Sequence, residues 1–581
     1  MITLTRVFAL RLSLATLAGL LAAIAGDFAG ARAQTPPPIL PVPQGSPIPF
    51  IAPRAGPSTS IPAAPAPLPQ PTALPAANVA VTSVAIEGAT AYPAARLLAF
   101  TKSLVGPQTS LHDIEEARRG ILLLYRNDGY PFIVVAVRID KSGALRFLIS
   151  EGYISEVKLS GDIGPVGTLV LKFLNHLTEQ HPINNATIER WLLLAQSIPG
   201  LQIQPVMQKS ETTPGAFTLV AKVSVNRVSG SLAVDNNADP QSGAGEGLLT
   251  VGLNSLTAWG ERSEAALYFS GPNGQQTFGQ FSEQAFIGGS GLSVRLYVGH
   301  GNTLPCCDLR TIRYDGLTTV YGAQLSYPLL LSRQQQLYLR ASLDAVDSDT
   351  QEQGARASGD SVRALRLSGD YSLSDIVLGD TRQGDSHVSV VLSKGLSILG
   401  ASVNGRADAG RLNENLDFSK VSGYIDRDQT LLTVPNGPRI SLYGLATGQG
   451  TSDVLPSVEQ FYLGGIHYTR GFYAGEVTGD NALAGTGELR VTSHFTLDAF
   501  GTEVPITPQF YLFYDWGETW QNQTSDRNQI LRSYGGGVRT GITQYMHVDL
   551  QVLRRITRQV GGPETSPLAA EAFYARLVTE F

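Results

Sequence analysis

The chain has 581 residues, enough for several domains, and a formal net charge of −6 with 16% charged residues. It lacks the basic patch or arm of a nucleic-acid binder, so no nucleic acid is expected as a partner. Glycine is abundant, at 61 residues, and aromatic residues make up 8% of the chain, a mixture that favours many strands and turns.

Residues 1–33 have the features of a secretory signal peptide. Arg6 and Arg11 supply a positive start, an apolar run covers 12–25, and 31–33 forms a small-x-small cleavage site. The apolar run is too short to cross a bilayer comfortably, which favours a cleaved signal over the alternative of an uncleaved anchor. No later segment offers the ~20 continuous apolar residues of a membrane helix, so any insertion must use strands.

Residues 34–78 hold fifteen of the 34 prolines. Such a density prevents a helix and a packed core, because proline removes a backbone donor and clashes with the preceding turn. We interpret the segment as an extended, semi-rigid linker, with a polyproline ligand for a partner as the alternative.

The two cysteines, Cys306 and Cys307, are adjacent in the sequence. Neighbouring residues can close only a strained vicinal disulfide, so this is not a disulfide scaffold. Without nearby histidines the pair is also a poor zinc site, and neither a metal nor another cofactor is expected. We interpret the pair as a loop feature, with a reactive redox pair as the alternative.

Residues 79–151 and 152–226 have the pattern of two small α/β modules, each running strand, helix, helix, strand, strand. The expected elements of the first are a strand at 81–86, a helix that follows Ser110 as N-cap, and strands at 132–139 and 145–149. Those of the second are a strand at 154–159, helices at 168–177 and 185–196, and strands at 203–207 and 217–225.

From 227 to 581 the hydrophobic period changes to two, and no long helix is expected. In 337–345, leucine and alanine alternate with tyrosine, arginine, serine and aspartate. An apolar face opposite a charged face is what a water-filled transmembrane barrel requires, although a soluble β-sandwich also alternates. Roughly sixteen such segments of about ten residues follow one another, and an even number is what bacterial barrels require. The last one ends on an aromatic residue, Phe581, as bacterial outer-membrane barrels commonly do.

The predicted turns of the barrel alternate in length. Short ones at 288–291 and 434–437 suit the periplasmic side, and long ones at 301–316, 402–416 and 450–483 suit the cell surface. The cysteine pair would then lie outside the cell.

Two short stretches are candidates for a contact inside the barrel. One is the Gly-rich run from Leu463 to Phe472, which contains Arg470, and the other is the segment 513–517 around Asp515. If the apolar face of the second segment meets lipid, Asp515 points inward and needs a cation, for which Arg470 is the natural candidate. Gly471 is expected to let the loop turn sharply beside the arginine. The alternative is a solvated arginine and a carboxylate that merely lines the lumen.

These features together resemble the two-partner secretion transporters, the TpsB type or ShlB/FhaC/HecB haemolysin secretion/activation proteins, of the outer-membrane POTRA-barrel superfamily. The resemblance covers everything after the linker. The residues that carry it most specifically are Glu459 to Gly465, Thr469-Arg470-Gly471-Phe472 and Phe513-x-Asp515-x-Gly517. Thr469 and Phe472 depart from the family's usual Val-Arg-Gly-Tyr, whereas the Arg-Gly pair is kept. Further similar positions are Gly479-Asp480, Glu488-Leu489-Arg490 and Ile198-Pro199-Gly200.

The resemblance implies a transmembrane β-barrel of about sixteen antiparallel strands in the cell outer membrane, preceded by two POTRA domains in the periplasm. It implies that the POTRA domains recognise an unfolded partner exoprotein, a TpsA-like haemolysin or adhesin, for export through the barrel. Its long loop would fold into the lumen so that Arg470 pairs with Asp515. It also implies that barrel-assembly machinery reads Phe581 as a C-terminal signal and that lipid surrounds the barrel. The prolines of 34–78 argue against the N-terminal plug helix of well-studied relatives.

The nearest alternative is an outer-membrane protein insertase of the same superfamily, and alternatives of other classes are a passive porin and a surface receptor. An insertase would share the arginine and aspartate motifs but usually carries more POTRA modules. A porin would not explain the two α/β modules. No catalytic residues are expected, because the chain has neither a Gly-x-Ser-x-Gly elbow nor a His-Glu-x-x-His motif. It also lacks a phosphate-binding loop, so export would have to proceed without ATP.

Overall fold

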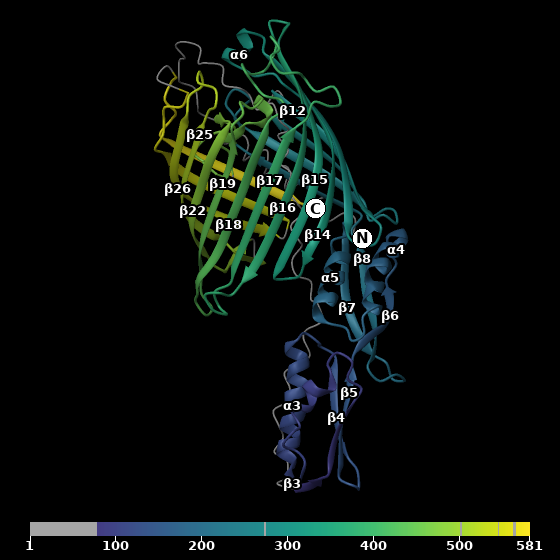
Figure 1. Ribbon diagram of the computed structural model, residues 1–581. Coiled ribbons are helices and arrows are strands. Elements are labelled where there is room, and N and C mark those ends of the chain that lie inside the picture. The colour runs from purple at the N-terminus through teal and green to yellow at the C-terminus, as the bar shows by residue number, and fades with distance from the viewer. Residues whose placement is uncertain (1–77, 272–274, 467, 500–501, 544, 562–564) are drawn as a thin grey trace. The chain divides into compact units, whose positions relative to one another are not determined.

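The computed structural model of the chain describes residues 78–271, 275–466, 468–499, 502–543, 545–561 and 565–581 (Figure 1). The expected signal peptide and nearly all of the Pro-rich linker, with the question of a plug, lie outside these residues. Asn78 begins a strand, so the linker ends at least one residue earlier than expected. Among the described residues, no helix is both long and apolar enough to span a bilayer.

The first α/β module has a three-stranded sheet in the order β2-β5-β4, with β2 parallel and β4 antiparallel to β5, and a separate β1–β3 pair. Helix α3 begins where the sequence predicts, because the Ser110 hydroxyl accepts a hydrogen bond of 3.1 Å from the Asp113 backbone N–H. The expected strand at 81–86 is broken at Thr82, whose N–H bonds to the Gly143 carbonyl instead. The elements are β1 (Asn78–Val81), β2 (Ser83–Glu87), α2 (Ala94–Leu98), β3 (Gly106–Ser110), α3 (Leu111–Asn127), β4 (Ile133–Ile139) and β5 (Ala144–Glu151).

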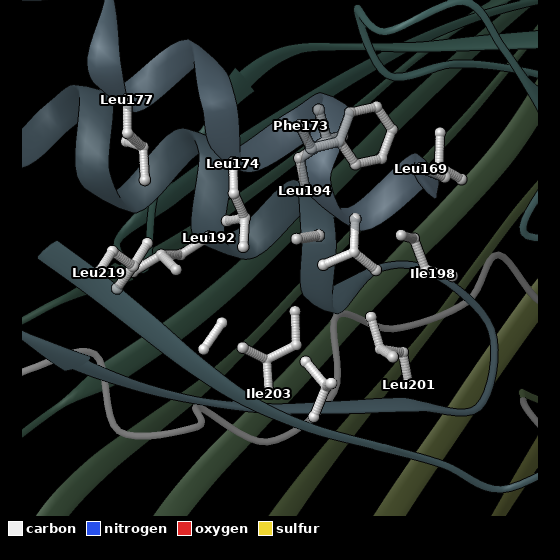
Figure 2. Close-up of a cluster of buried hydrophobic side chains, with 14 of the residues drawn as sticks. Leu169, Phe173, Leu174, Leu177, Leu192, Leu194, Ile198, Leu201, Ile203 and Leu219 are labelled. Atoms are coloured by element: carbon white, nitrogen blue, oxygen red, sulfur yellow. The ribbon is translucent and has the colours of Figure 1, made fainter. Parts of the chain in front are cut away.

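The second module repeats this plan with the sheet order β6-β8-β7, in which β6 is parallel and β7 antiparallel to β8. Leu169 and Phe173 of α4, Leu192 of α5 and Leu219 of β8 meet in one apolar core (Figure 2). The Asn184 side chain caps α5 by accepting from the Thr187 N–H at 2.8 Å. The elements are β6 (Tyr153–Ser160), η1 (Gly164–Val166), α4 (Gly167–Leu174), η2 (Asn175–Thr178), α5 (Asn185–Gln196), β7 (Leu201–Lys209) and β8 (Ala216–Val225).

The remainder forms a closed antiparallel barrel of sixteen strands, which confirms the predicted fold class. Strand β28 closes it against β9. The strands are β9 (Val228–Asp235), β10 (Glu246–Asn254), β11 (Arg262–Ser270), β12 (Gln276–Ile287), β13 (Leu292–Thr303), β14 (Asp315–Leu331), β15 (Gln335–Glu352), β16 (Ala355–Asp375), β17 (Gly384–Gly395), β18 (Ser419–Thr433), β19 (Arg439–Thr451), β22 (Asn481–Thr492), β25 (Gln509–Trp520), β26 (Gln529–Thr543), β27 (Met546–Arg555) and β28 (Glu571–Glu580).

The two faces of the barrel wall differ in the way that the alternation predicts. On β25, Leu512 is 65% exposed on the outer face, whereas Asp515 is 0% exposed on the inner face. The outward residues Phe510 and Tyr514 are likewise exposed, and the inward Phe513 is buried. An apolar outer band with a polar interior is the pattern of a barrel whose solvent is lipid.

The connections between strands alternate between two rims. One rim, where β9 begins, carries mostly short turns and one hairpin of β23 (Phe495–Ala499) and β24 (Thr502–Ile506). The opposite rim carries the longer loops, named here loop 3 (304–314), loop 5 (396–418), loop 6 (452–480) and loop 7 (521–528). Loop 3 contains the short helix α6 (Asp308–Thr311) and a disulfide between Cys306 and Cys307. Loop 6 contains η3 (Ser457–Glu459) and the paired strands β20 (Phe461–Leu463) and β21 (Val477–Gly479).

Candidate functional site: a loop anchored inside the barrel

Loop 6 brings its Gly-rich run to the inner wall of the barrel. Gly464 and Thr469 both have positive φ angles, 104° and 53°. The Thr469 hydroxyl accepts a hydrogen bond of 2.8 Å from the Gly464 N–H, which closes this turn on itself. Glycine is required at 464 because a Cβ there would lie 1.9 Å from the Tyr473 carbonyl oxygen. The turn therefore projects the next residue, Arg470, in one defined direction.

Gly471 lies in a turn, as the sequence suggests, because the Phe472 N–H donates a hydrogen bond of 3.0 Å to the Thr469 carbonyl, although the φ angle of Gly471 itself is not positive. A Cβ at this position would also lie 2.6 Å from the Cβ of Ser533 on β26. Its carbonyl accepts a hydrogen bond from the Arg555 guanidinium of β27. Glycine is thus needed for close approach of the loop backbone to the wall, and the left-handed residue is Thr469.

The Arg470 side chain is 4% exposed and faces Asp515. Its Nη2 lies 2.7 Å from Asp515 Oδ1 and its Nε 3.0 Å from Oδ2, which is the bidentate geometry of strong arginine–carboxylate pairs. The Arg470 backbone N–H donates a third bond to Oδ2 at 2.8 Å. Asp515 therefore fixes both the side chain and the backbone of the loop at this residue.

Glu488 of β22 is a second carboxylate at Arg470, bonded to its Nη1. The same carboxylate accepts from Arg539 of β26 at 2.9 Å and from Arg490 at 2.6 Å. Thr486 adds a hydroxyl at 2.8 Å from Arg470 Nη2. Two carboxylates and three arginines thus interlock, and a single change in this network alters the balance of a buried charge cluster.

The other predicted motif residues pack around this pair. The Arg470 guanidinium lies 3.9 Å from the centre of the Phe513 ring, within the range of a cation–π contact. Phe472 is fully buried in a cluster with Leu463 and neighbouring apolar residues. At Gly517 a Cβ would lie 2.8 Å from Thr469 Cγ2, so this glycine leaves room for the loop. The structure therefore brings all seven predicted motif residues to one place.

Phe581 lies elsewhere, at the seam of the barrel. Its backbone exchanges two hydrogen bonds with Gly230 of β9, at 2.9 and 3.0 Å. Its ring is 58% exposed on the outer face.

A further network, which the sequence did not indicate, connects loops 5, 6 and 7 at the rim that carries the longer loops. Arg411 of loop 5 lies 2.6 Å from Asp480 of loop 6 and 2.8 Å from Asp526 of loop 7. Asp480 is fully buried and also accepts from the backbone N–H groups of Leu455 and Asn522. The only signal in the sequence was the Gly479-Asp480 pair, and nothing there indicated an arginine 69 positions away as its partner.

At the other rim, the second α/β module contacts the barrel. Arg190 of α5 donates to the Pro328 carbonyl of β14 at 3.1 Å. A cavity of about 890 Å³ is bounded by module residues such as Gln204 and Lys222 and by inward-facing barrel residues such as Arg295 and Arg340. It joins the polar face of the module's sheet to the barrel interior.

Comparisons with known proteins agree with this architecture. The family model "Haemolysin secretion/activation protein ShlB/FhaC/HecB" matches residues 219–540, and the model "POTRA domain, ShlB-type" matches residues 79–152. Among curated proteins, the heme/hemopexin transporter protein HuxB of Haemophilus influenzae (strain 86-028NP) is 21% identical over 452 residues, covering 75% of this chain and 76% of that protein.

Two solved structures are similar in fold. CdiB from Escherichia coli superposes with a TM-score of 0.67 at 16% identity, over 88% of this chain and 93% of CdiB. BamA from Haemophilus ducreyi lacking POTRA domains 1–3 superposes with a TM-score of 0.51 at 11% identity, over 87% of this chain and 100% of that chain.

Proposed function

Because the chain belongs to the haemolysin secretion/activation protein (ShlB/FhaC/HecB) family of outer-membrane secretion transporters, we propose that it exports an unfolded partner exoprotein through its barrel without ATP. The rim where β9 begins then faces the periplasm, and loops 3, 5, 6 and 7 face the cell surface. The partner is a TpsA-like exoprotein, of the haemolysin or adhesin kind.

The anchored Arg470 is the observation that carries the proposal. A buried ion pair adds little net stability, but removing one partner strands a charge at a cost of ~3–5 kcal/mol. The Arg470–Asp515 contact therefore acts as a position lock for loop 6 rather than as a general stabiliser. Three hydrogen bonds to one carboxylate hold this long surface loop inside the channel, and a passive pore would not explain the two α/β modules that precede the barrel.

The POTRA domains would make the first contact with the passenger. Strand β7 pairs with β8 on one side only, so its other edge presents free backbone donors and acceptors in the described sheet. An extended passenger segment can add to such an edge as a further strand. The junction cavity beside Gln204 of β7 would then pass the segment to the polar interior of the barrel.

The energy for export would come from the passenger itself. The sequence has no phosphate-binding loop with which to use ATP. Folding of the passenger outside the cell would instead supply the free energy and make its passage irreversible. Assembly of the transporter is a separate step, and we propose that barrel-assembly machinery recognises Phe581, whose ring is exposed toward the lipid.

The deciding experiment is comparative mass spectrometry of surface and medium proteins from cells with and without this gene. We expect the loss of one or two large exoproteins, which would also identify the passenger. A broad loss of outer-membrane barrels would overturn the proposal in favour of an insertase function. The fold similarity to BamA is the reason for testing this outcome. An unchanged profile would overturn it in favour of a pore or receptor.

A further inference from the structure

Glu459 is a second charged residue of loop 6 that is buried against the barrel wall. It ends the short helix η3, eleven positions before Arg470, and is 2% exposed. Its Oε1 lies 2.7 Å from Nη2 of Arg366 on β16, and its Oε2 lies 2.8 Å from Nζ of Lys420 on β18. The Lys420 ammonium also donates to the Glu459 backbone carbonyl at 2.6 Å.

The cations at Glu459 have few other partners. Among the residues that the structure describes, Lys420 pairs with no other carboxylate, and Arg366 pairs with one, Asp344 of β15, at 2.8 Å. Two cations and two carboxylates therefore balance at this point of the wall. Without the Glu459 carboxylate, one buried positive charge would be left uncompensated, which is the strongly unfavourable case for a buried ion pair.

The two anchors of loop 6 lie on different parts of the wall. Glu459 binds β16 and β18, whereas Arg470 binds β22 and β25, and the Gly471 carbonyl reaches Arg555 of β27. In the closed order of sixteen strands, β27 stands seven positions from β16, close to half of the circumference. Glu459 and Arg470 themselves thus hold strands that stand two to five positions apart, and the contact of Gly471 with Arg555 extends the attachment of loop 6 to nearly half of the wall.

The anchors also have opposite signs. The loop offers a carboxylate to a basic part of the wall and a guanidinium to an acidic part. Exchanging the two would bring like charges together, which is unfavourable at short range in a low-dielectric interior. The pair of anchors therefore specifies one orientation of the loop, which neither anchor does alone.

We propose that Glu459 is a second positioning residue of the transporter, which with Arg470 holds loop 6 across the lumen and narrows the pore at rest. The inference rests on the proposed function in one respect, that the lumen is the export path. Without the Glu459 anchor, helix η3 is freed from β16 and β18, while Leu455 stays bonded to Asp480 and the Arg470 end stays bound.

The test measures the resting channel of the full-length protein in planar lipid bilayers. For Glu459→Gln we expect conductance to rise on the order of twofold or more, because an uncompensated buried charge displaces helix η3. Glu459→Asp keeps the charge and should recover part of the wild-type value. Lys420→Gln removes the same contact from the wall side, so it should also raise the conductance. The conductance of the double variant Glu459→Gln/Lys420→Gln should not exceed that of Glu459→Gln alone.

Glu264→Gln is the matched control, because Glu264 is a lumen carboxylate on β11 that pairs with Arg262 and Arg295 of the wall. It should leave conductance unchanged. Resistance of the folded barrel to unheated detergent shows that each variant is assembled, and if Glu459→Gln does not assemble, Lys420→Gln carries the test.

Passenger secretion is measured in the same strains, so that the two proposals can fail separately. Raised conductance in Glu459→Gln together with no passenger lost on deletion of the gene would support the anchor and overturn the export function. Wild-type conductance in assembled Glu459→Gln and Lys420→Gln would overturn the anchor, whatever the passenger does.

Discussion

Asp515 fixes loop 6 at two levels, because its carboxylate accepts hydrogen bonds from both the side chain and the backbone N–H of Arg470. We expect Arg470→Ala to leave the barrel assembled but to reduce passenger export on the order of tenfold or more, because it strands Asp515 at a cost of ~3–5 kcal/mol. Export by Arg470→Lys should fall between that of the wild type and that of Arg470→Ala, because an ammonium keeps the charge but cannot make the bidentate contact. Immunoblotting of the medium measures export, and normal secretion by Arg470→Ala would remove the role assigned to the loop.

A substitution at Gly471 tests whether export requires the close approach of the loop 6 backbone to strand β26. Gly471→Ala places a Cβ 2.6 Å from the Cβ of Ser533, a distance that side chains do not adopt, so the loop must shift. We expect export to fall and the second-site change Ser533→Gly to restore part of it, because that change removes the opposing atom. Secretion of the passenger by the single and double variants checks this. Equal export by Gly471→Ala and the wild type would show that the backbone contact is dispensable.

At the scale of elements, Glu151 joins three parts of the first POTRA domain. Burial alone would raise the pKa of Glu151, but hydrogen bonds from Thr90, Tyr125 and the backbone of Ala91 outweigh it and hold the pKa below its ordinary value. A depressed pKa contributes stability that is present above the unfolded value, about 4.3, and is lost as the pH falls through the folded value. The domain should therefore loosen below about pH 4.3 through this group.

Amide hydrogen exchange of helix α3 in the full-length protein, at pH 7 and in acid, measures that effect. We expect protection of the segment around Tyr125 to decrease in acid. The variant Glu151→Gln should lower the free energy of opening of this segment already at pH 7, by about 1–3 kcal/mol, because a carboxylate acceptor is lost from a partly buried site. Glu115→Gln, a partly exposed helix change, serves as the control and should have a small effect. Identical exchange at pH 7 in Glu151→Gln and the wild type would contradict the assignment.

At the scale of the whole molecule, Arg411 joins three surface loops that are far apart in the sequence. We expect Arg411→Ala to leave the buried Asp480 with backbone donors and to release loop 5 from loops 6 and 7. Proteinase K added to intact cells should then cut within 396–418 several times faster, while the barrel stays protected. Cleavage at the wild-type rate would mean that the loops are held by other contacts.

Local chemistry in the sequence determined much of this protein. The start of α3 at the Ser110 cap and the bounds of α5 depend on neighbouring residues, so they could be predicted. The period of two placed Asp515 on the inner face, because strand side chains alternate whatever the register. The Arg-Gly and Phe-x-Asp-x-Gly motifs, compared with a known family, indicated the partner of Arg470.

Only the tertiary structure decided which charge meets which. Alternation places many arginines and carboxylates inside the barrel, but the partner of each depends on strand stagger and loop path, which no local pattern encodes. Glu459 therefore finds Arg366 across 93 positions, and Arg411 finds Asp480 across 69. The need for glycine at 471 has the same origin, since the atom that excludes a side chain belongs to Ser533, on a strand brought close only by closure of the barrel.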